Sequence, residues 1–238
     1  MYTDIHSHIL PNVDDGAKSE KESLQILQSM AKQGITSVVV TPHFYSLNCY
    51  EPKVHKENLK KVFEGLLNKA KNIVPNIILG HEVHYFKGIS SCEEIKELTM
   101  GESSYILIEL PMCNFKDDVA DEIMALALDF GLKPIIAHVE RYAFAEGFRS
   151  ILKLVESGLA IAHVNCDSIV DRRTRKNALN LIKYGFASFI TTDAHSIKKR
   201  PPLMDKALKI IENKLGAEVR EKLRLNANNL FKNIEGKV

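Results

Sequence analysis

The stretch Asp4-Ile-His-Ser-His-Ile-Leu-Pro-Asn-Val-Asp-Asp-Gly16 decides how this chain is interpreted. It closes a short apolar run with two histidines, His6 and His8, one residue apart. Because side chains alternate along a strand, both imidazoles project from the same face. Two aspartates, Asp14 and Asp15, follow in what reads as a loop. The stretch therefore predicts a polar site where a buried strand gives way to a loop.

The rest of the chain repeats this arrangement, with short β runs alternating with amphipathic helical runs. The first helix opens with a capping box at Ser19 and Glu22 and ends at Gly34. Strands are expected at Tyr2–His8, Ile35–His43, Ile73–Glu82, Tyr105–Leu110, Pro134–Val139, Leu159–Asn165 and Ala187–Asp193. Further helices are expected at Val54–Asn72, Glu93–Leu98, Asp117–Phe130, Phe148–Ser157, Ser168–Tyr184, Pro202–Leu215 and Glu218–Asn229.

Glycines mark the repeat. Gly131, Gly158 and Gly185 each follow a helical run and precede a strand that ends in a polar residue. Near-continuous apolar strands indicate a parallel sheet covered on both faces. Seven or so such units predict an α/β fold that closes, or nearly closes, into a barrel with its site at the carboxyl ends of the strands. An open doubly wound sheet is the alternative, but it would gather polar residues at one switch point.

Composition narrows the class of protein. The 238 residues carry 32 Lys and Arg against 30 Asp and Glu, a net charge of +2, which disfavours a nucleic-acid surface. No apolar run reaches the ~18 residues of a membrane span, and the first residues lack a signal peptide, so a cytoplasmic protein is expected. Without a linker, residues 1–238 are expected to form a single domain. Without a CxxC pair, Cys49, Cys92, Cys113 and Cys166 are expected to be reduced thiols.

Polar residues recur at the ends of nearly all the predicted strands, and parallel strands would bring them to one rim. Four carboxylates gathered there would repel one another, and burying them uncompensated is costly. Divalent cations resolve this conflict, and imidazole with carboxylate suits manganese, iron or zinc better than magnesium. Nine ligands exceed the needs of one ion, so two or three are expected. The set comprises His6, His8, Asp15, His43, Glu82, Glu109, His138, Asp193 and His195.

These motifs resemble the PHP (polymerase and histidinol phosphatase) superfamily. The similarity is strongest to its bacterial protein-tyrosine phosphatases of the capsule and exopolysaccharide clusters, the CpsB/YwqE type. It covers essentially the whole chain and rests on the opening stretch together with Thr41-Pro-His43, Glu109, His138-Val-Glu-Arg-Tyr142, Asp193-Ala-His195 and Arg200-Pro-Pro202.

The resemblance implies a distorted (β/α)7 TIM-like barrel holding a trinuclear metal centre, usually credited to manganese, with iron, zinc or magnesium as alternatives. It implies that the nine residues above are the metal ligands and that Glu109 is the bridging carboxylate. Asp14 is the alternative ligand if Asp15 is not the matching residue. Arg141 and Arg200 match the phosphate-contacting arginines, and with Asp193 and His195 they form the expected catalytic set.

The implied reaction is hydrolysis of phosphotyrosine on a protein, with attack by a hydroxide that a metal ion generates at neutral pH. Phenolate is a tolerable leaving group because the phenol has a pKa of ~10. The implied partner is the phosphorylated, tyrosine-rich tail of a bacterial tyrosine kinase that regulates polysaccharide export. Neither nucleic acid nor membrane insertion is expected.

Several alternatives remain open at this level. Histidinol phosphate or another small phosphomonoester would need much the same metal site, and the loops Phe44–Tyr50, Tyr85–Ile89 and Met112–Asp117 do not reveal which substrate they accept. An amidohydrolase often carries a modified lysine where this chain has Glu109. A degenerate scaffold module would not need a full set of ligands.

Other residues need their own interpretation. The run from Cys166 to Arg172 fits the C-x5-R signature of cysteine phosphatases, but it contains two aspartates and no glycine, so the match is read as chance. His163 stands where the family has Gln and is read as a hydrogen-bonded core histidine. Asn226-Ala227 replaces the usual Asn-Pro. His84 is a spare ligand candidate, while His55 and His81 are read as surface or structural residues.

Overall fold

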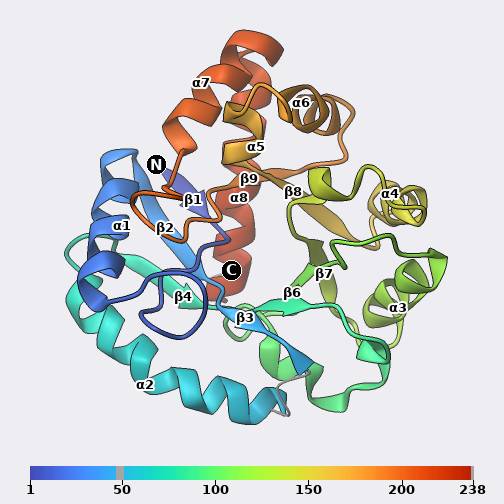
Figure 1. Ribbon diagram of the computed structural model, residues 1–238, viewed down its shortest axis with the longest axis horizontal. Helices are drawn as coiled ribbons and strands as arrows, with labels where there is room; N and C mark the ends of the chain where they lie inside the picture. The colour runs from blue at the N-terminus through green and yellow to red at the C-terminus, as the bar shows by residue number, and fades with distance from the viewer. Residues whose placement is uncertain (47–50, 237–238) are drawn as a thin grey trace.

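Parallel strands form the centre of the molecule and helices surround them (Figure 1). The structure is a computed structural model that describes residues 1–46 and 51–236. Cys49 and the end of the Phe44–Tyr50 loop lie outside the described residues. One sheet has the order β1 (Tyr2–Asp4), β2 (Ile35–Val40) and β4 (Asn76–Leu79). The other has the order β3 (His43–Phe44), β5 (Glu82–His84), β6 (Tyr105–Glu109), β7 (Lys133–Ile136), β8 (Ile161–Asn165) and β9 (Phe189–Thr191).

Every named strand pair is parallel, which confirms the α/β class. Two predicted strands are wrong as single elements, because the chain passes from one sheet to the other within each. Pro42 separates β2 from β3, since it has no N–H to donate. Gly80 separates β4 from β5 where space is limited, because an added Cβ would lie 2.9 Å from the Met100 side chain.

The helices follow the predicted order with adjusted ends. The Ser19 cap is confirmed, because its side chain accepts a hydrogen bond from Glu22 N. The α-helices are α1 (Glu20–Lys32), α2 (Pro52–Ala70), α3 (Asp117–Leu128), α4 (Phe148–Glu156), α5 (Cys166–Val170), α6 (Arg175–Lys183), α7 (Met204–Leu215) and α8 (Ala217–Glu235). Short 3-10 helices are η2 (Ile89–Ser91), η3 (Glu93–Leu98) and η4 (Val139–Tyr142).

The helix predicted over Ser168–Tyr184 is wrong, since two helices, α5 and α6, stand there. Local side-chain bonds form the turn between them. Asp171 Oδ1 accepts from the backbone N–H of Arg173 (2.9 Å), and the Thr174 hydroxyl donates to the Ser168 carbonyl (2.8 Å). Such bonds give the backbone an alternative to helical pairing.

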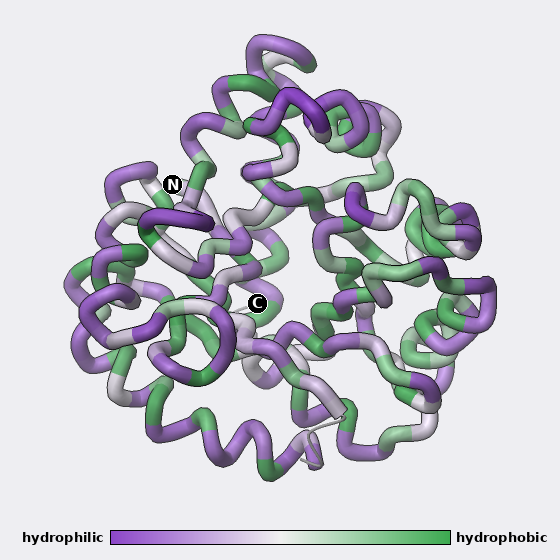
Figure 2. The backbone as a smooth tube through the Cα atoms, viewed as in Figure 1, coloured by the Kyte–Doolittle hydropathy of each residue, from purple (hydrophilic) through white to green (hydrophobic). Residues whose placement is uncertain are grey.

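Two apolar clusters surround the strands. The larger lies under the outer helices, whose turns alternate between hydrophobic and hydrophilic residues in Figure 2. The smaller joins strand residues such as Val39, Leu107 and Phe189 to Leu230 and Phe231 of α8. Helix α8 passes behind the strands near the centre of Figure 1 and contacts β1 and β9. Inward-facing strand residues therefore pack against α8.

Candidate metal centre

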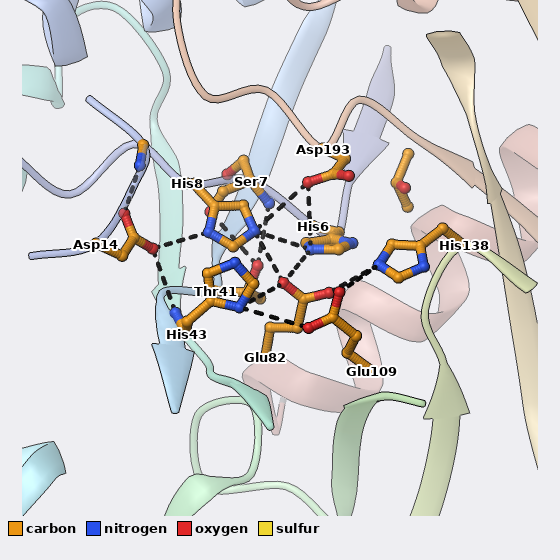
Figure 3. Close-up of polar contacts among 12 residues, drawn as sticks. His6, Ser7, His8, Asp14, Thr41, His43, Glu82, Glu109, His138 and Asp193 are labelled. Atoms are coloured by element: carbon orange, nitrogen blue, oxygen red, sulfur yellow. Dashed lines mark hydrogen bonds and ion pairs between the residues drawn. The ribbon is translucent and has the colours of Figure 1, made fainter. Parts of the chain in front are cut away.

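All nine predicted ligand residues gather at one edge of the two sheets, where β1, β6, β7 and β9 end and β3 and β5 begin, and Figure 3 shows seven of them. His6 and His8 follow β1, His43 opens β3, and Glu82 opens β5. The remaining strand-end residues are Glu109 at the end of β6, His138 after β7, and Asp193 and His195 after β9. Asp15 comes from the loop after His8 and is the exposed member, with 65% of its side chain accessible. The polar residues at the ends of the predicted strands therefore form one cluster in the structure.

Glu82 lies at the centre of this cluster. Its Oε2 is 3.2 Å from His6 Nε2, 3.0 Å from His8 Nε2 and 3.2 Å from His43 Nδ1. Its Oε1 is 3.1 Å from His138 Nε2. Burial alone would raise the pKa of Glu82, but the surrounding imidazoles hold it well below its usual range. Glu82 is therefore an anion shared among four imidazoles.

Glu109 stands at the edge of the same cluster. Its Oε1 lies 3.4 Å from His138 Nε2, and its Oε2 lies 3.9 Å from His43 Nδ1 and 3.0 Å from His84 Nδ1. Burial opposes ionisation, but hydrogen bonds from His138 and His84 lower the pKa of Glu109 to about 2. His84, one third exposed, thus contacts a ligand candidate from the solvent side.

Within residues 1–46 and 51–236, three groups of donor atoms are compact enough to hold a metal ion, each with its atoms within 4.8 Å of one another. They are His8, Asp15, His43 and His195; His6, His8 and Asp193; and His43, Glu82 and Glu109. The groups share members, and they use eight of the nine predicted residues. His138 belongs to none of the three but contacts both glutamates.

Asp193 provides a test of whether a cation fits here. Its Oδ2 accepts hydrogen bonds from Asn165 (2.6 Å), Arg200 (2.5 Å) and Arg141 (3.2 Å). Its Oδ1 is buried and has no hydrogen-bond partner among residues 1–46 and 51–236, yet it lies 3.6 and 3.5 Å from Nε2 of His6 and His8. An unpartnered buried carboxylate oxygen needs an explanation. A divalent ion held by Asp193, His6 and His8 would supply one, so the residues fit a metal.

The two aspartates of the opening loop take different positions. Asp14 Oδ2 is 2.8 Å from His8 Nδ1, and the carboxylate also accepts from the backbone N–H groups of Gly16 (2.8 Å) and His43 (3.2 Å). Burial opposes its ionisation, but the His8 contact lowers the pKa of Asp14 to about 2. Asp14 therefore orients His8 from behind. Asp15 faces the cluster, 3.3 Å from His195 Nε2.

The two predicted arginines border the cluster. Both guanidinium groups reach Asp193, and Arg200 Nη1 also lies 2.8 Å from His195 Nε2. Because arginine only donates, His195 Nε2 accepts, and its Nδ1–H donates to the Asp193 carbonyl (2.9 Å). Burial lowers the pKa of His195 to about 4. The Arg141 and Arg200 side chains remain 26% and 35% accessible, so they face the opening of the site.

The backbone is strained at two of these positions. His138 and Asp193 have φ values of 32° and 48°, in the left-handed region that side chains other than glycine rarely adopt. Each follows a strand, and the reversal turns the next residues out of the sheet direction. Strain of this kind persists where the surrounding structure enforces it, and functional sites are where it collects.

Sequence reasoning missed the contacts that several neighbouring residues make with the cluster. The Tyr142 hydroxyl lies 3.1 Å from His138 Nδ1, and His163 Nε2 lies 3.1 Å from His6 Nδ1. Thr191 and Asn165 continue this contact toward Asp193. The available signal was Asn165, a polar residue ending a strand like the nine ligand candidates. His163 is fully buried and hydrogen-bonded, which confirms its interpretation as a core histidine.

The C-x5-R match is confirmed as chance. Cys166 is fully buried with its Sγ 3.9 Å from Met204 Sδ, and burial raises the pKa of its thiol well above the usual value. Arg172 is exposed on the turn between α5 and α6. A buried neutral thiol is not a nucleophile. Cys92, Cys113 and Cys166 are free thiols, as expected.

Comparison with known proteins places this geometry in a family. The family model described as capsular polysaccharide synthesis, CpsB/CapC, matches residues 2–232. The chain belongs to the CpsB/CapC family. This CpsB/CapC chain is 30% identical to tyrosine-protein phosphatase YwqE of Bacillus subtilis, covering 97% of this chain and 91% of the relative. It is 29% identical to tyrosine-protein phosphatase CpsB of Streptococcus pneumoniae, covering 92% and 93%.

Solved structures agree with this assignment. A structure from work on YwqE of Bacillus subtilis and CpsB of Streptococcus pneumoniae, described as unique metal-dependent tyrosine phosphatases, matches the CpsB/CapC chain with a TM-score of 0.81 at 28% identity, covering 97% of this chain and 94% of that one. Histidinol phosphate phosphatase of Lactococcus lactis, solved with zinc, L-histidinol and phosphate, matches with a TM-score of 0.55 at 14% identity, which shows a shared fold alone. Over residues 1–46 and 51–236, no helix is long and apolar enough to cross a membrane.

Proposed function

We propose that this chain is a metal-dependent phosphomonoesterase that hydrolyses phosphotyrosine on proteins. The observation that carries the proposal is a buried cluster of imidazoles and carboxylates with an unpartnered oxygen at its centre and two guanidinium groups at its opening. The relatives named as tyrosine-protein phosphatases support the substrate class.

The metal ligands in this proposal are His6, His8, Asp15, His43, Glu82, Glu109, His138, Asp193 and His195. Their donor atoms form three overlapping groups, which supports two or three ions, with manganese favoured by the mixed imidazole and carboxylate set. When bound, such ions act as Lewis acids and make a water nucleophile available at neutral pH. Every other contribution comes from the chain's own side chains.

Arg141 and Arg200 hold the phosphoryl group. Each can donate two parallel hydrogen bonds to non-bridging phosphate oxygens, which fixes orientation as well as charge. Asp193 holds both guanidinium groups at the opening before substrate arrives. His195 is neutral at pH 7, because burial lowers its pKa to about 4, so it does not donate a proton to the departing phenolate. Its Nε2 serves as a ligand when Arg200, now 2.8 Å away, turns from it to the phosphoryl group.

A groove beside His195 provides room for a peptide. It has a volume of about 540 Å³ and includes Lys18, Lys198, Lys199 and Arg200 in its lining. A run of cations beside a phosphate site suits an acidic, multiply phosphorylated segment. The partner we propose is the tyrosine-rich tail of a bacterial tyrosine kinase that controls capsule or exopolysaccharide synthesis, with the phosphatase acting in the cytoplasm.

The two sheets, in this proposal, form one distorted (β/α)7 barrel within a single domain, 1–238. Backbone bonds beyond the named strands support it. His8 N–H donates to the Ala194 carbonyl, and Thr41 N–H donates to the Ser7 carbonyl (both 2.9 Å). Ser7 and Ala194 also form an isolated parallel bridge. The segment after β1 therefore lies between the ends of β2 and β9.

The test compares two substrates over four metals. The enzyme is stripped with a chelator, refilled with manganese, iron, zinc or magnesium, and assayed on a phosphotyrosine peptide and on histidinol phosphate. Metal-dependent release from the peptide alone is expected. Phosphate release from histidinol phosphate alone would support the proposed metal site but contradict the proposed kinase partner. Full activity in a protein free of metal by elemental analysis would overturn the proposal.

A further inference from the structure

A column of inward side chains connects α8 to the metal centre. Strands β8 and β9 run in parallel register, with His163 opposite Phe189 and Asn165 opposite Thr191. Because side chains alternate along a strand, Phe189, Thr191 and Asp193 lie on one face, as do His163 and Asn165. Phe189 packs in the α8 cluster, and Asp193 reaches the site. His163, Thr191 and Asn165 fill the layer between them.

These residues form an unbroken series of hydrogen-bond contacts. His6 Nδ1 is 3.1 Å from His163 Nε2, and His163 Nδ1 is 2.9 Å from Thr191 Oγ1. Thr191 Oγ1 is 3.2 Å from Asn165 Oδ1, and Asn165 Nδ2 is 2.6 Å from Asp193 Oδ2. All five residues are buried. The series begins at one proposed metal ligand and ends at another.

The direction of the series is determined at Asp193. An ionised carboxylate only accepts, so Asn165 donates its N–H to Asp193 and turns its Oδ1 toward Thr191. That oxygen accepts the Thr191 proton, which leaves Thr191 Oγ1 to accept from His163. The proton of His163 therefore sits on Nδ1, and its Nε2 accepts from His6.

We propose that His163 is a positioning residue that fixes His6 as the tautomer protonated on Nδ1, so that its Nε2 lone pair faces the metal centre. The proposal rests on the proposed function. His6 Nε2 lies 3.2 Å from Glu82 Oε2 and 3.6 Å from Asp193 Oδ1, on the side of the ring away from His163. A metal-binding histidine needs an acceptor behind its second nitrogen, and a carboxylate, carbonyl or water usually fills that role. Here a neutral imidazole does, anchored through two further side chains.

The series also couples two ligands that are far apart in sequence. Asp193 Oδ2 accepts a hydrogen bond from Asn165, while Oδ1, which has no hydrogen-bond partner in the described part of the chain, is left to face the imidazoles. Breaking the series at Thr191 would let His163 adopt the other tautomer and donate to His6. His6 would then carry its proton on Nε2, where it blocks coordination.

The experiment uses zinc, which is diamagnetic, and protein labelled with nitrogen-15 in histidine. In the zinc-loaded wild type, NMR is expected to show His6 and His163 both protonated on Nδ1, with the signals assigned by comparison with His163→Gln. Zinc affinity is measured by competition with a chelator. Thr191→Val is expected to weaken zinc binding about ten- to a hundredfold. Thr191→Ser keeps the hydroxyl and is expected to bind as the wild type does.

His163→Gln is the second variant. A glutamine can accept from His6 Nδ1 through its oxygen and donate to Thr191 through its amide, so zinc affinity should stay within a few fold, whereas His163→Leu should lose it as Thr191→Val does. A wild type that binds neither zinc nor manganese would overturn the proposed function, and if manganese alone binds, the affinities of the wild type and Thr191→Val are compared with manganese. A wild type that binds zinc with His6 protonated on Nε2, or a folded Thr191→Val of unchanged affinity, would overturn this inference alone. If Thr191→Val does not fold, the His6 and His163 tautomers measured by NMR in the wild type test the inference.

Discussion

Two groups of buried histidines in this molecule behave in opposite ways. In the metal centre, burial alone would lower the pKa of His8, but its bonds to Asp14 and Glu82 raise it to about 10. Beside α2, burial, with a smaller contribution from the neighbouring His55, lowers the pKa of His81 to about 3. Both His8 and His81 are almost completely inaccessible to solvent. The extent of burial therefore does not explain the difference between the pKa values of His8 and His81.

The difference lies in the carboxylates. His55 and His81 pack ring against ring at 5.4 Å, His55 also meets Phe44, and neither His81 ring nitrogen has a hydrogen-bond partner within residues 1–46 and 51–236. The two rings therefore pack as neutral, apolar groups in the core. The histidines of the centre instead share Glu82, Glu109 and Asp193, which makes a place for positive charge. Burial with carboxylates, not burial alone, identifies a cation site.

The largest expected effect comes from removing the shared carboxylate. Glu82→Gln should lower kcat/KM on a phosphotyrosine peptide at least about a thousandfold and reduce the bound metal, because Glu82 contacts four imidazoles. Elemental analysis and steady-state rates measure both. Glu57→Gln on the exposed face of α2 is the matched control. A Glu82→Gln protein with its full metal content and normal rate would break the comparison.

The arginines should show a smaller effect that leaves the metal in place. Arg200→Lys is expected to lower kcat/KM about a hundredfold at unchanged metal content, since lysine cannot donate two parallel bonds to phosphate. Arg173→Lys is the control, because Arg173 is exposed and pairs only with Asp171 in the residues described. Loss of metal from Arg200→Lys would mean that the arginine acts through Asp193 and not on the substrate.

The His55 and His81 pair should make the free energy of unfolding depend on pH. A neutral buried histidine with a lowered pKa stabilises the fold above the unfolded pKa of about 6.5, and this contribution is lost as pH falls toward the folded value. Between pH 7 and pH 5, His81 should therefore remove about 2 kcal/mol from the free energy of unfolding.

His81→Leu should abolish that loss while leaving metal content unchanged. Urea denaturation of both proteins at the two pH values measures the difference. Equal pH dependence in wild type and variant would show that His81 is not buried as a neutral group, and the contrast with His8 would fail.

The smallest effect is expected at the thiol. Cys166→Ser should leave activity within a few fold, because the thiol is buried and contacts Met204 away from the metal centre. Phosphatase assays over a range of metal concentrations would test this. Complete loss of activity in a folded variant would restore the cysteine mechanism.

The polar residues at strand ends, together with the family resemblance, predicted nine residues that form one cluster in the structure. They cluster because parallel strands end at the same rim. The sequence did not reveal where the sheet breaks. Pro42 and Gly80 looked like strand residues, and their effect depends on the neighbouring strand and on Met100. Nor did it reveal the layer of His163, Thr191 and Asn165, since that layer depends on the register between β8 and β9. Local patterns predict which residues reach a rim, whereas contacts across strands need the fold.

Helix α8 has a consequence for the order of events during turnover. Its Leu230 and Phe231 pack in one buried apolar cluster with inner strand residues such as Leu107 and Phe189, so side chains fill the interior on the α8 side of the metal centre. Substrate and both products then use the opening bordered by Arg141 and Arg200. With the phosphoryl group held as proposed and the tyrosine ring pointing outward, the phenol leaves before inorganic phosphate, and phosphate left behind competes with the next phosphotyrosine. Accumulating phosphate would therefore slow the enzyme as a competitive inhibitor, linking its rate to how fast the product diffuses away.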